Sequence, residues 1–352
     1  MAKVKLCDVI IRANTKVDKD NTHLTYYVGG EHFESGNVTV ENKGLIAGST
    51  IGPMFYYGFK AGQFLLVSRN PHLRKAGVVD FDGICSEKTC VLETANAEVL
   101  LPEYLPFVLQ NDTFWDYAVE HKHGSTNFFI NWSTLANYEF ELPDIGTQKR
   151  IADLAWAAHN LKKCYQKQIA ATDNLVKSQF IEMFYGKEYP TVEVGTVLKQ
   201  VLKTERIVDT LAEKYVTVAL YGNGARERNI DIYDPKPFTA YRIRTGQFIY
   251  SRIDARNGAF SVVPPRLDGA VVSKDFPVFD IDTSRISPQT LLFSVLDENF
   301  IQQIKNASFG STNRQRIKED VFLKYRIVLP PLQVQKKFED VIEQSDKSKF
   351  VG

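Results

Sequence analysis

Side chains with planar hydrogen-bonding groups gather on glycine-containing loops in the second half of this 352-residue chain. Arginine can donate two parallel hydrogen bonds to guanine, and asparagine or glutamine can pair in a similar way with adenine, in the major groove of DNA. Glycine supplies the backbone freedom that a close approach to a base requires. The segments "YGNGARERN", "SRIDARNG" and "GSTNRQR" supply the candidate contacts Asn223, Arg226, Arg228, Arg252, Arg256, Asn257, Ser311, Asn313, Arg314, Gln315 and Arg316.

A smaller basic set lies in the first half. The segments "SRNPHLRKAG" and "EHKHGSTN" supply the candidate contacts Ser68, Arg69, Asn70, Arg74, Lys75, Lys122, His123, Ser125, Thr126 and Asn127. Residues 1–143 contain 12 Lys+Arg and 17 Asp+Glu, whereas residues 188–330 contain 20 and 17. Because arginine reads bases and lysine or serine more often holds phosphates, we expect the second half to make the stronger base-specific contacts. For any single arginine the alternative is an ion pair with a nearby carboxylate such as Glu227 or Asp254.

The candidate loops belong to a sequence order that occurs twice. "VKLCDVI" parallels "VEVGTVL", "KAGQFLLVSR" parallels "RTGQFIYSRI", and "GSTN" at Gly124 recurs at Gly310. The offsets fall between 184 and 188 residues, and the order is kept. A period this long indicates a duplicated domain rather than a solenoid. Short aromatic and β-branched runs, with helices expected after Pro102 and Pro288, predict an α+β fold for each copy.

The segment between the copies has the pattern of a long helix. It has no proline from Ile145 to Tyr185 and no glycine after Gly146. About 40 residues at 1.5 Å each would make a rod of about 60 Å. Spacings of three and four predict a heptad seam of Ile151, Leu154, Ala158, Leu161, Tyr165, Gln168, Thr172 and Leu175. The expected partner is a helix with Val334, Phe338, Val341 and Ile342. The alternative is an amphipathic helix packed on its own domain.

This layout resembles the specificity (S) subunit of type I restriction-modification systems over essentially the whole chain. The expected parts are a first copy, a central spacer helix, a second copy and a short C-terminal spacer helix, at residues 1–143, 144–187, 188–330 and 331–352. The junctions Gly124–Ile151 and Gly310–Phe338 carry the resemblance, because each runs from Gly-Ser-Thr through Leu-Pro to a glutamine at a helix start. Family members usually have Glu-Gln at that start, where this chain has Thr-Gln and Val-Gln.

The resemblance implies two similar target recognition domains with mixed β-sheet cores, separated by long antiparallel coiled-coil-like helices. Each domain would read one half of a bipartite target in double-stranded DNA. The helices would set the spacing and dock DNA adenine methyltransferase subunits, and restriction/translocase subunits would join that core for phage defence in the cytoplasm of a bacterium or archaeon. The chain itself would be non-catalytic and hold no cofactor, with S-adenosylmethionine, ATP and Mg bound by the partner subunits.

Sequence motifs for catalysis by this chain are missing. "NPHL" at Asn70 and "DPKP" at Asp234 lack the second proline and the aromatic residue of a methyltransferase tetrapeptide, and "GLIAGST" lacks the lysine of a phosphate loop. The four cysteines do not complete a metal-ligand set, and no apolar run reaches the ~18 residues of a membrane span, so neither a metal nor a membrane is expected. Two rival hypotheses are a DNA methyltransferase or nuclease with its own catalytic site and a two-headed protein-binding scaffold.

Overall fold

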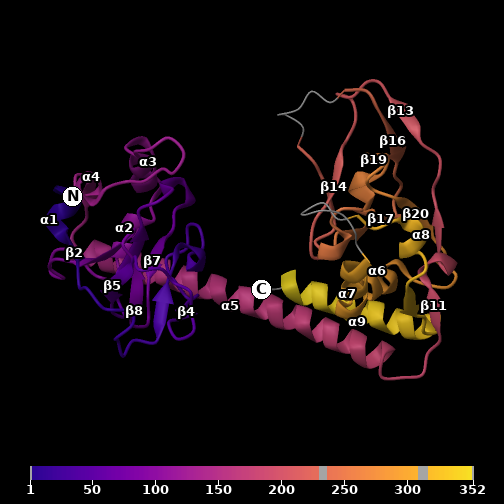
Figure 1. Ribbon diagram of the computed structural model, residues 1–352, viewed down its shortest axis with the longest axis horizontal. Helices are drawn as coiled ribbons and strands as arrows, with labels where there is room; N and C mark the ends of the chain where they lie inside the picture. The colour runs from indigo at the N-terminus through magenta and orange to yellow at the C-terminus, as the bar shows by residue number, and fades with distance from the viewer. Residues whose placement is uncertain (1, 230–235, 308–315, 351–352) are drawn as a thin grey trace. The chain divides into compact units, whose positions relative to one another are not determined.

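The computed structural model describes residues 2–229, 236–307 and 316–350 (Figure 1). Its contacts divide the chain into two units, Met1–Cys164 and Tyr165–Gly352. Each unit has hydrophobic clusters of its own. The division falls inside a single helix, α5 (Ile145–Phe184).

Unit 1 combines small sheets with short helices. β1 pairs with β10, and β2-β9-β6-β7 form an antiparallel sheet. The sheet β4-β3-β8-β5 is mixed, because β3 and β8 run parallel. Aromatic and β-branched runs such as "FLLV" in β6 account for the strands, since such side chains fit a pleated, buried surface. The strands are β1 (Ala2–Lys5), β2 (Ile10–Ala13), β3 (Tyr26–Val28), β4 (Gly44–Leu45), β5 (Phe55–Phe59), β6 (Phe64–Val67), β7 (Ala76–Val78), β8 (Gly83–Ser86), β9 (Thr89–Thr94) and β10 (Glu139–Leu142). The helices are α1 (Leu6–Val9), η1 (Gly30–His32), η2 (Pro71–Leu73), α2 (Leu105–Leu109), α3 (Asp112–Glu120), α4 (Trp132–Leu135) and the start of α5.

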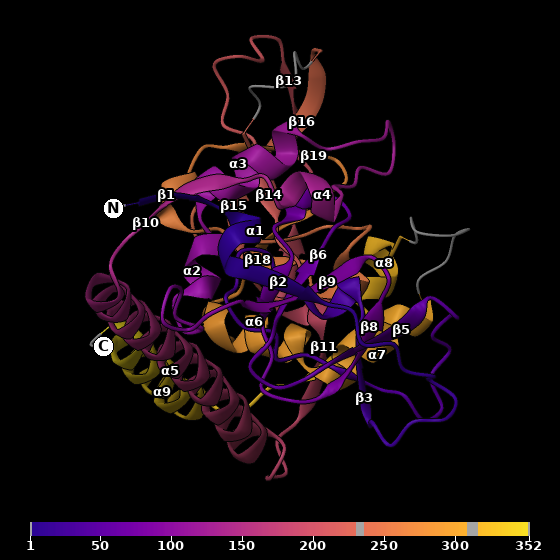
Figure 2. The same cartoon turned by 90° about the vertical axis from the view of Figure 1, so that its left-hand side faces the viewer.

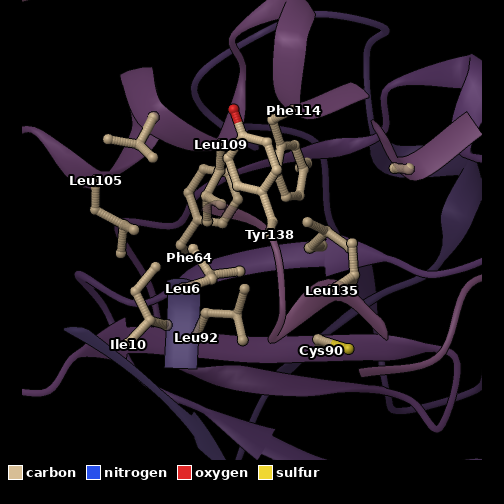
Figure 3. Packing of buried hydrophobic residues seen from close by; sticks show 14 of the residues in the cluster. Leu6, Ile10, Phe64, Cys90, Leu92, Leu105, Leu109, Phe114, Leu135 and Tyr138 are labelled. Atoms are coloured by element: carbon tan, nitrogen blue, oxygen red, sulfur yellow. The ribbon is translucent and has the colours of Figure 1, made fainter. Parts of the chain in front are cut away.

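A buried cluster joins the sheet β2-β9-β6-β7 to the helices α2 and α3. Figure 3 shows side chains from β6, β9, α2 and α3 gathered around Tyr138. The rings of Phe114 and Tyr138 meet edge to face with centroids 5.2 Å apart, an arrangement that aromatic pairs favour. The Tyr138 hydroxyl lies 2.9 Å from the Thr113 hydroxyl, so its polar end is hydrogen-bonded. This core supports the strand ends from which the candidate loops leave.

Unit 2 has a related set of sheets. β11 pairs with β21, β12-β20-β17-β18 form an antiparallel sheet, β13-β16-β19 form another, and β14 and β15 form a hairpin. The strands are β11 (Thr191–Glu193), β12 (Leu198–Gln200), β13 (Glu205–Ile207), β14 (Val216–Val218), β15 (Ala225–Glu227), β16 (Phe238–Arg242), β17 (Phe248–Tyr250), β18 (Phe260–Val262), β19 (Val271–Ser273), β20 (Val278–Ile281) and β21 (Arg326–Val328). The helices after α5 are η3 (Val194–Thr196), η4 (Ala255–Asn257), η5 (Pro265–Leu267), α6 (Pro288–Leu296), α7 (Glu298–Ala307), α8 (Glu319–Phe322) and α9 (Leu332–Phe350).

One framework recurs in the two units. The order β2-β9-β6-β7 in unit 1 is repeated by β12-β20-β17-β18 in unit 2. Gln63 and Gln247, at equivalent positions, each accept a backbone hydrogen bond at 2.8 Å and donate one to a carboxylate at 2.7 Å. The antiparallel pair β1-β10 is likewise repeated by β11-β21. The third sheets differ, because β13-β16-β19 is antiparallel throughout whereas β4-β3-β8-β5 is mixed.

A buried glutamine begins the first spacer helix and joins three segments of unit 1. The Gln148 side chain has 0% exposure. Its Nε2 donates to the carbonyl oxygens of Val99 and Pro143 at 2.9 Å each, and its Oε1 accepts the Leu101 N–H at 2.9 Å. This role explains why a glutamine follows Leu-Pro, since a buried amide is tolerated where its donors and acceptor are all used.

The second spacer helix begins with the same arrangement. Gln335 has 1% exposure, and its Nε2 donates to the carbonyl oxygens of Arg285 and Pro330 at 2.9 Å each. Its Oε1 accepts the Ser287 N–H at 2.7 Å. The recurring Leu-Pro and glutamine thus have a structural role in each unit.

Helix α9 runs back along the C-terminal part of α5 (Figures 1 and 2). The contact buries Val176, Phe180 and Phe184 of α5 against Phe338 of α9. The rings of Phe184 and Phe338 lie 5.3 Å apart. Val176, Phe180 and Phe184 are spaced by four residues and therefore share one face of α5.

This face is not the predicted heptad seam. Two seam members, Leu154 and Leu161, are 74% and 55% exposed. The N-terminal part of α5, which belongs to unit 1, instead packs Trp156 against the segment that contains α2. The Trp156 Nε1 donates to the Glu103 carbonyl at 2.9 Å, and its ring packs on Phe107. The larger aromatic side chains determine which faces of α5 are covered, because they bury more apolar area than the leucines of the seam. Ile151, Leu154 and Leu161 of the seam therefore form an exposed apolar stripe on the N-terminal part of α5.

Candidate nucleic-acid interface

In unit 1 the first candidate loop leaves the end of β6 at Ser68. The Ser68 N–H and hydroxyl both donate to the Lys88 carbonyl, at 2.7 and 2.8 Å, and the Ser68 carbonyl accepts the Ile130 N–H at 2.9 Å. The N–H, hydroxyl and carbonyl of Ser68 are therefore all engaged in hydrogen bonds within the protein. They also place the turn at Lys88 beside the start of the loop, so the serine positions neighbouring side chains.

The structure brings the two candidate segments of unit 1 together. Phe129 forms antiparallel bridges with Arg69 on one side and with His123 on the other. His123 and Phe129 exchange backbone hydrogen bonds of 2.7 and 3.0 Å and thereby close a small loop. Gly124 turns this loop with φ 92°, a conformation that favours glycine. The exposed tip of the loop consists of Ser125, Thr126 and Asn127.

The backbone around Asn70 follows an unusual path. Asn70 and Arg74 flank η2 and both have left-handed conformations, with φ 50° and 48°. The Asn70 N–H donates to the Phe128 carbonyl at 2.8 Å, which ties this turn to the closed loop. Such conformations cost free energy, and asparagine tolerates them better than arginine does.

Some candidate cations of unit 1 have partners within the protein. Arg74 forms an ion pair with Asp112, and the Lys75 ammonium donates to the Gly30 carbonyl at 2.6 Å. The Lys122 ammonium lies 4.6 Å from the centre of the Phe128 ring. We therefore regard these three side chains as weaker candidates for DNA contact than exposed Arg69.

Arg69 stands near a small charged turn. Glu87 pairs with Lys88 at 2.8 Å. The hydrogen bond from Lys88 lowers the pKa of the Glu87 carboxyl, and the charge of Arg69 acts in the same direction. Lys88 was not among the sequence candidates, because its place beside Ser68 arises from a contact twenty residues away in the chain.

In unit 2 the turn after β14 and the turn at η4 are joined. The Tyr221 N–H donates to the Asn257 carbonyl at 2.8 Å, and the Gly222 N–H donates to the Gly258 carbonyl at 2.9 Å. Asn223 is exposed, and its side chain caps the Leu220 carbonyl at 2.9 Å. Two of the three arginine-bearing segments of unit 2 therefore form one continuous surface.

Arg226 is an exposed arginine of this surface whose side chain points away from the protein. It lies on β15 opposite Thr217 of β14. Its neighbour Ala225 is buried with 2% exposure, and successive side chains of a strand point to opposite faces, so Arg226 points outward. Arg228 follows β15, is exposed, and donates its backbone N–H to the Tyr215 carbonyl at 2.8 Å.

Other arginines of unit 2 form ion pairs. The Arg252 Nε donates to Glu319 at 2.6 Å, and Nη2 contacts the same carboxylate. Arg316 lies 3.2 Å from Asp275. The ion-pair alternative therefore describes both residues, although with partners other than those expected. Arg256 is half-buried and also has an interaction within the protein. Four candidates lie outside the described residues: Ser311, Asn313, Arg314 and Gln315.

The backbone that carries these loops matches that of unit 1. The Arg252 N–H donates to the Asp275 carbonyl at 3.0 Å, and the Arg252 carbonyl accepts the Ile317 N–H at 3.2 Å. Ser68 makes the equivalent pair of bonds in unit 1. The same scaffold position thus holds a serine in one unit and a paired arginine in the other.

Within the described ranges, no three His, Cys, Asp or Glu residues gather in a way that could hold a metal ion. No helix among the same residues combines the length and apolar character that crossing a membrane requires.

No protein-family model matches the chain, and no curated protein matches it. A chain of the type I R-M system, from work on complex assembly and conformational transition, matches with a TM-score of 0.51 and 17% identity, over 99% of this chain and 91% of that chain. The type I restriction-modification S subunit from M. genitalium matches with a TM-score of 0.57 and 12% identity, over 99% and 90%. The HsdS subunit from Thermoanaerobacter tengcongensis matches with a TM-score of 0.40 and 17% identity, over 99% and 89%. The chain has the fold of type I restriction-modification S subunits, as its sequence resemblance indicates.

Proposed function

We propose that this chain is the sequence-specific DNA-recognition subunit of a type I restriction-modification complex, with each unit reading one half of a bipartite target. The observation that carries the proposal is the recurring scaffold at Ser68 and Arg252, from which chemically different loops leave. Because the scaffold is shared, both units would hold their candidate loops toward DNA in the same way. Different loops give each unit its own base preference, as direct readout requires.

The loops of unit 2 have the donors for base recognition. Arg226 and Asn223 are exposed on the hairpin that is tied to Asn257. In unit 1, Arg69 and the polar tip at Ser125–Asn127 offer fewer planar donors and more groups suited to phosphates. We therefore expect unit 2 to discriminate more strongly between bases than unit 1.

The exposed stripe of α5 provides a docking surface for DNA adenine methyltransferase subunits. Leu154 and Leu161 are exposed leucines seven residues apart, which places them on one helix face. Apolar side chains in this arrangement are suited to receive a partner helix. The methyl donor S-adenosylmethionine would be bound by that partner, and ATP and Mg by restriction/translocase subunits, so this chain would carry out no bond-breaking step.

The proposal is tested by mapping methylated adenine in genomic DNA from strains with and without an intact gene for this chain. Loss of methylation at one two-part motif, with restoration by the wild-type gene, is the expected result. An unchanged methylation map would refute the proposal. Binding of S-adenosylmethionine by the isolated chain would instead favour the rival hypothesis of a methyltransferase with its own catalytic site.

A first prediction concerns the length of α5. Inserting four helix-forming residues after Lys167 adds about one turn of 5.4 Å. We expect the preferred spacer between the two half-sites to grow by about one or two base pairs, because base pairs rise about 3.4 Å each along DNA. The readout is methylation mapping in cells that carry the variant. The same insertion after Gly48, in a loop of unit 1, is the control, and an unaltered spacer in the α5 variant would contradict the prediction.

A second prediction concerns the stripe. Changing both Leu154 and Leu161 to aspartate should weaken binding to the methyltransferase subunit by about tenfold or more, because charge would enter an apolar interface. The melting temperature should stay nearly constant, since both side chains are already exposed. Calorimetric titration measures the affinity. Asn160→Asp, an exposed change elsewhere on α5, is the control. Equal affinities for the three proteins would show that methyltransferase docks elsewhere.

A further inference from the structure

Tyr221 combines two features that seldom occur together. Its backbone is left-handed, with φ 58°. This conformation is uncommon for residues other than glycine and is unusual for a bulky aromatic one. Its side chain is 76% exposed, so it buries little apolar area that would offset this cost. An outlier of this kind is a reason to look for a function.

The surrounding loop holds Tyr221 in this conformation. Its N–H donates to the Asn257 carbonyl at 2.8 Å, and the next N–H, of Gly222, donates to Gly258 at 2.9 Å. Gly222 has φ 72°, which favours glycine, and a Cβ there would lie 2.7 Å from the Leu296 side chain, which would have to move. The backbone on both sides of the tyrosine is therefore tightly placed, while the ring itself projects.

The ring stands among candidate DNA contacts. Asn223 follows it on the same turn, and Arg226 follows on β15, both exposed. Unit 1 offers no equivalent aromatic residue. The parallel bridge between Tyr215 and Val271 corresponds to the parallel pairing of β3 with β8, which makes β14 the counterpart of β3. In unit 1 the chain continues from β3 into a pair of glycines.

We propose that the Tyr221 ring stacks against a nucleobase of the DNA bound by unit 2. This inference rests on the proposed function. It gives Tyr221 a contact with the face of a base, whereas hydrogen-bonding side chains contact the edge. In a duplex the base faces are covered by the neighbouring pairs, so the ring would insert at a base step that partly unstacks, as wedge side chains do. An aromatic face can stack on any base, so this contact needs no particular sequence. Tyr221 would therefore add affinity and fix the position of the hairpin, while Asn223 and Arg226 supply discrimination.

The test compares three variants in the complete complex, bound to a duplex that carries the mapped two-part motif. Tyr221→Ala should weaken binding about tenfold, the scale of one lost stacking contact. Tyr221→Phe should stay within about twofold of wild type, because it keeps the ring. Tyr221→Gly should weaken binding as much as alanine, yet raise the melting temperature of the chain by about 2 °C, since glycine adopts positive φ without steric cost. Fluorescence of 2-aminopurine placed along the half-site of unit 2 should change at one position with wild type and not with Tyr221→Ala.

Leu202→Ala provides the matched control, because Leu202 is equally exposed at 76% and lies between β12 and β13. Unchanged affinity of Tyr221→Ala would overturn the inference, as would an equal loss with Tyr221→Phe, which would assign the effect to the hydroxyl. A marked fall in melting temperature for Tyr221→Gly would show that the ring is structural. If the wild-type complex does not bind the two-part motif in preference to other DNA, the proposed function is wrong. If the wild-type complex binds the motif but the variants do not differ as expected, only the inference about Tyr221 is wrong.

Discussion

Gln148→Leu is expected to lower the free energy of unfolding of unit 1 by about 3–5 kcal/mol. The fully buried amide makes hydrogen bonds with Val99, Leu101 and Pro143. Leucine fills a similar volume but leaves one N–H and two carbonyl groups without this partner, the Pro143 carbonyl in a buried site and the other two groups in part-buried ones. Each such group costs about 1–3 kcal/mol, and partial relaxation keeps the total below the sum.

The measurement uses the tryptophans as reporters. All three, Trp115, Trp132 and Trp156, lie in unit 1, so their fluorescence follows the unfolding of that unit in denaturant. Gln148→Leu should move this transition to lower denaturant concentration, because the midpoint follows the free energy of unfolding.

Gln335→Leu tests the equivalent site in unit 2. It should lower a transition seen by circular dichroism while the tryptophan transition stays in place. Gln168→Leu, on an exposed part of α5, should change either transition by less than about 0.5 kcal/mol. If Gln148→Leu behaves like Gln168→Leu, the buried amide contributes nothing to stability and the structural account of the recurring motif is wrong.

Changing both Arg226 and Arg228 to alanine should relax discrimination at the half-site read by unit 2 and leave the other half-site intact. A bidentate arginine–guanine contact is worth about 1–3 kcal/mol of discrimination, so loss of both would cost about 30-fold or more in selectivity. Arg226 is the stronger of the two, because it projects from β15 whereas Arg228 has an interaction within the protein. Competition binding with duplexes altered in one half-site at a time measures the effect.

A matched control separates base reading from charge. Lys199→Ala with Lys324→Ala removes the same two charges from unit 2 at exposed positions on and beside other strands. This control should leave the selectivity between sequences unchanged. If either lysine contacts phosphate, it should also weaken binding to all sequences alike and lower the dependence of binding on salt. Equal loss of selectivity at both half-sites in the arginine variant, or no loss, would contradict the assignment.

Several features of the fold could be predicted because their causes are local. The lack of proline and glycine after Gly146 predicts a long helix, and α5 runs from Ile145 to Phe184. Runs such as "GQFLLVS" and "GQFIYSRI" predict strands, and β6 and β17 form there. The face of α5 that meets α9 was predicted incorrectly. Spacing alone cannot tell which of two apolar faces packs, and the phenylalanines of α5 bury more area than the leucines.

For the candidate site, the sequence by itself determined which residue types were present and that their order is duplicated. Tertiary structure decided which of them act together. Arg69 meets the loop at His123 through Phe129, the turn of Tyr221 meets that of Asn257, and Arg252 is engaged by Glu319, 67 residues away. Four of the hydrogen bonds made by Gln148 and Gln335 likewise join residues that lie 47 to 50 positions apart in the chain. The physical reason is that conformational preference acts over a few neighbouring residues, whereas hydrogen bonds, ion pairs and exposure depend on segments that only the folded chain brings into contact.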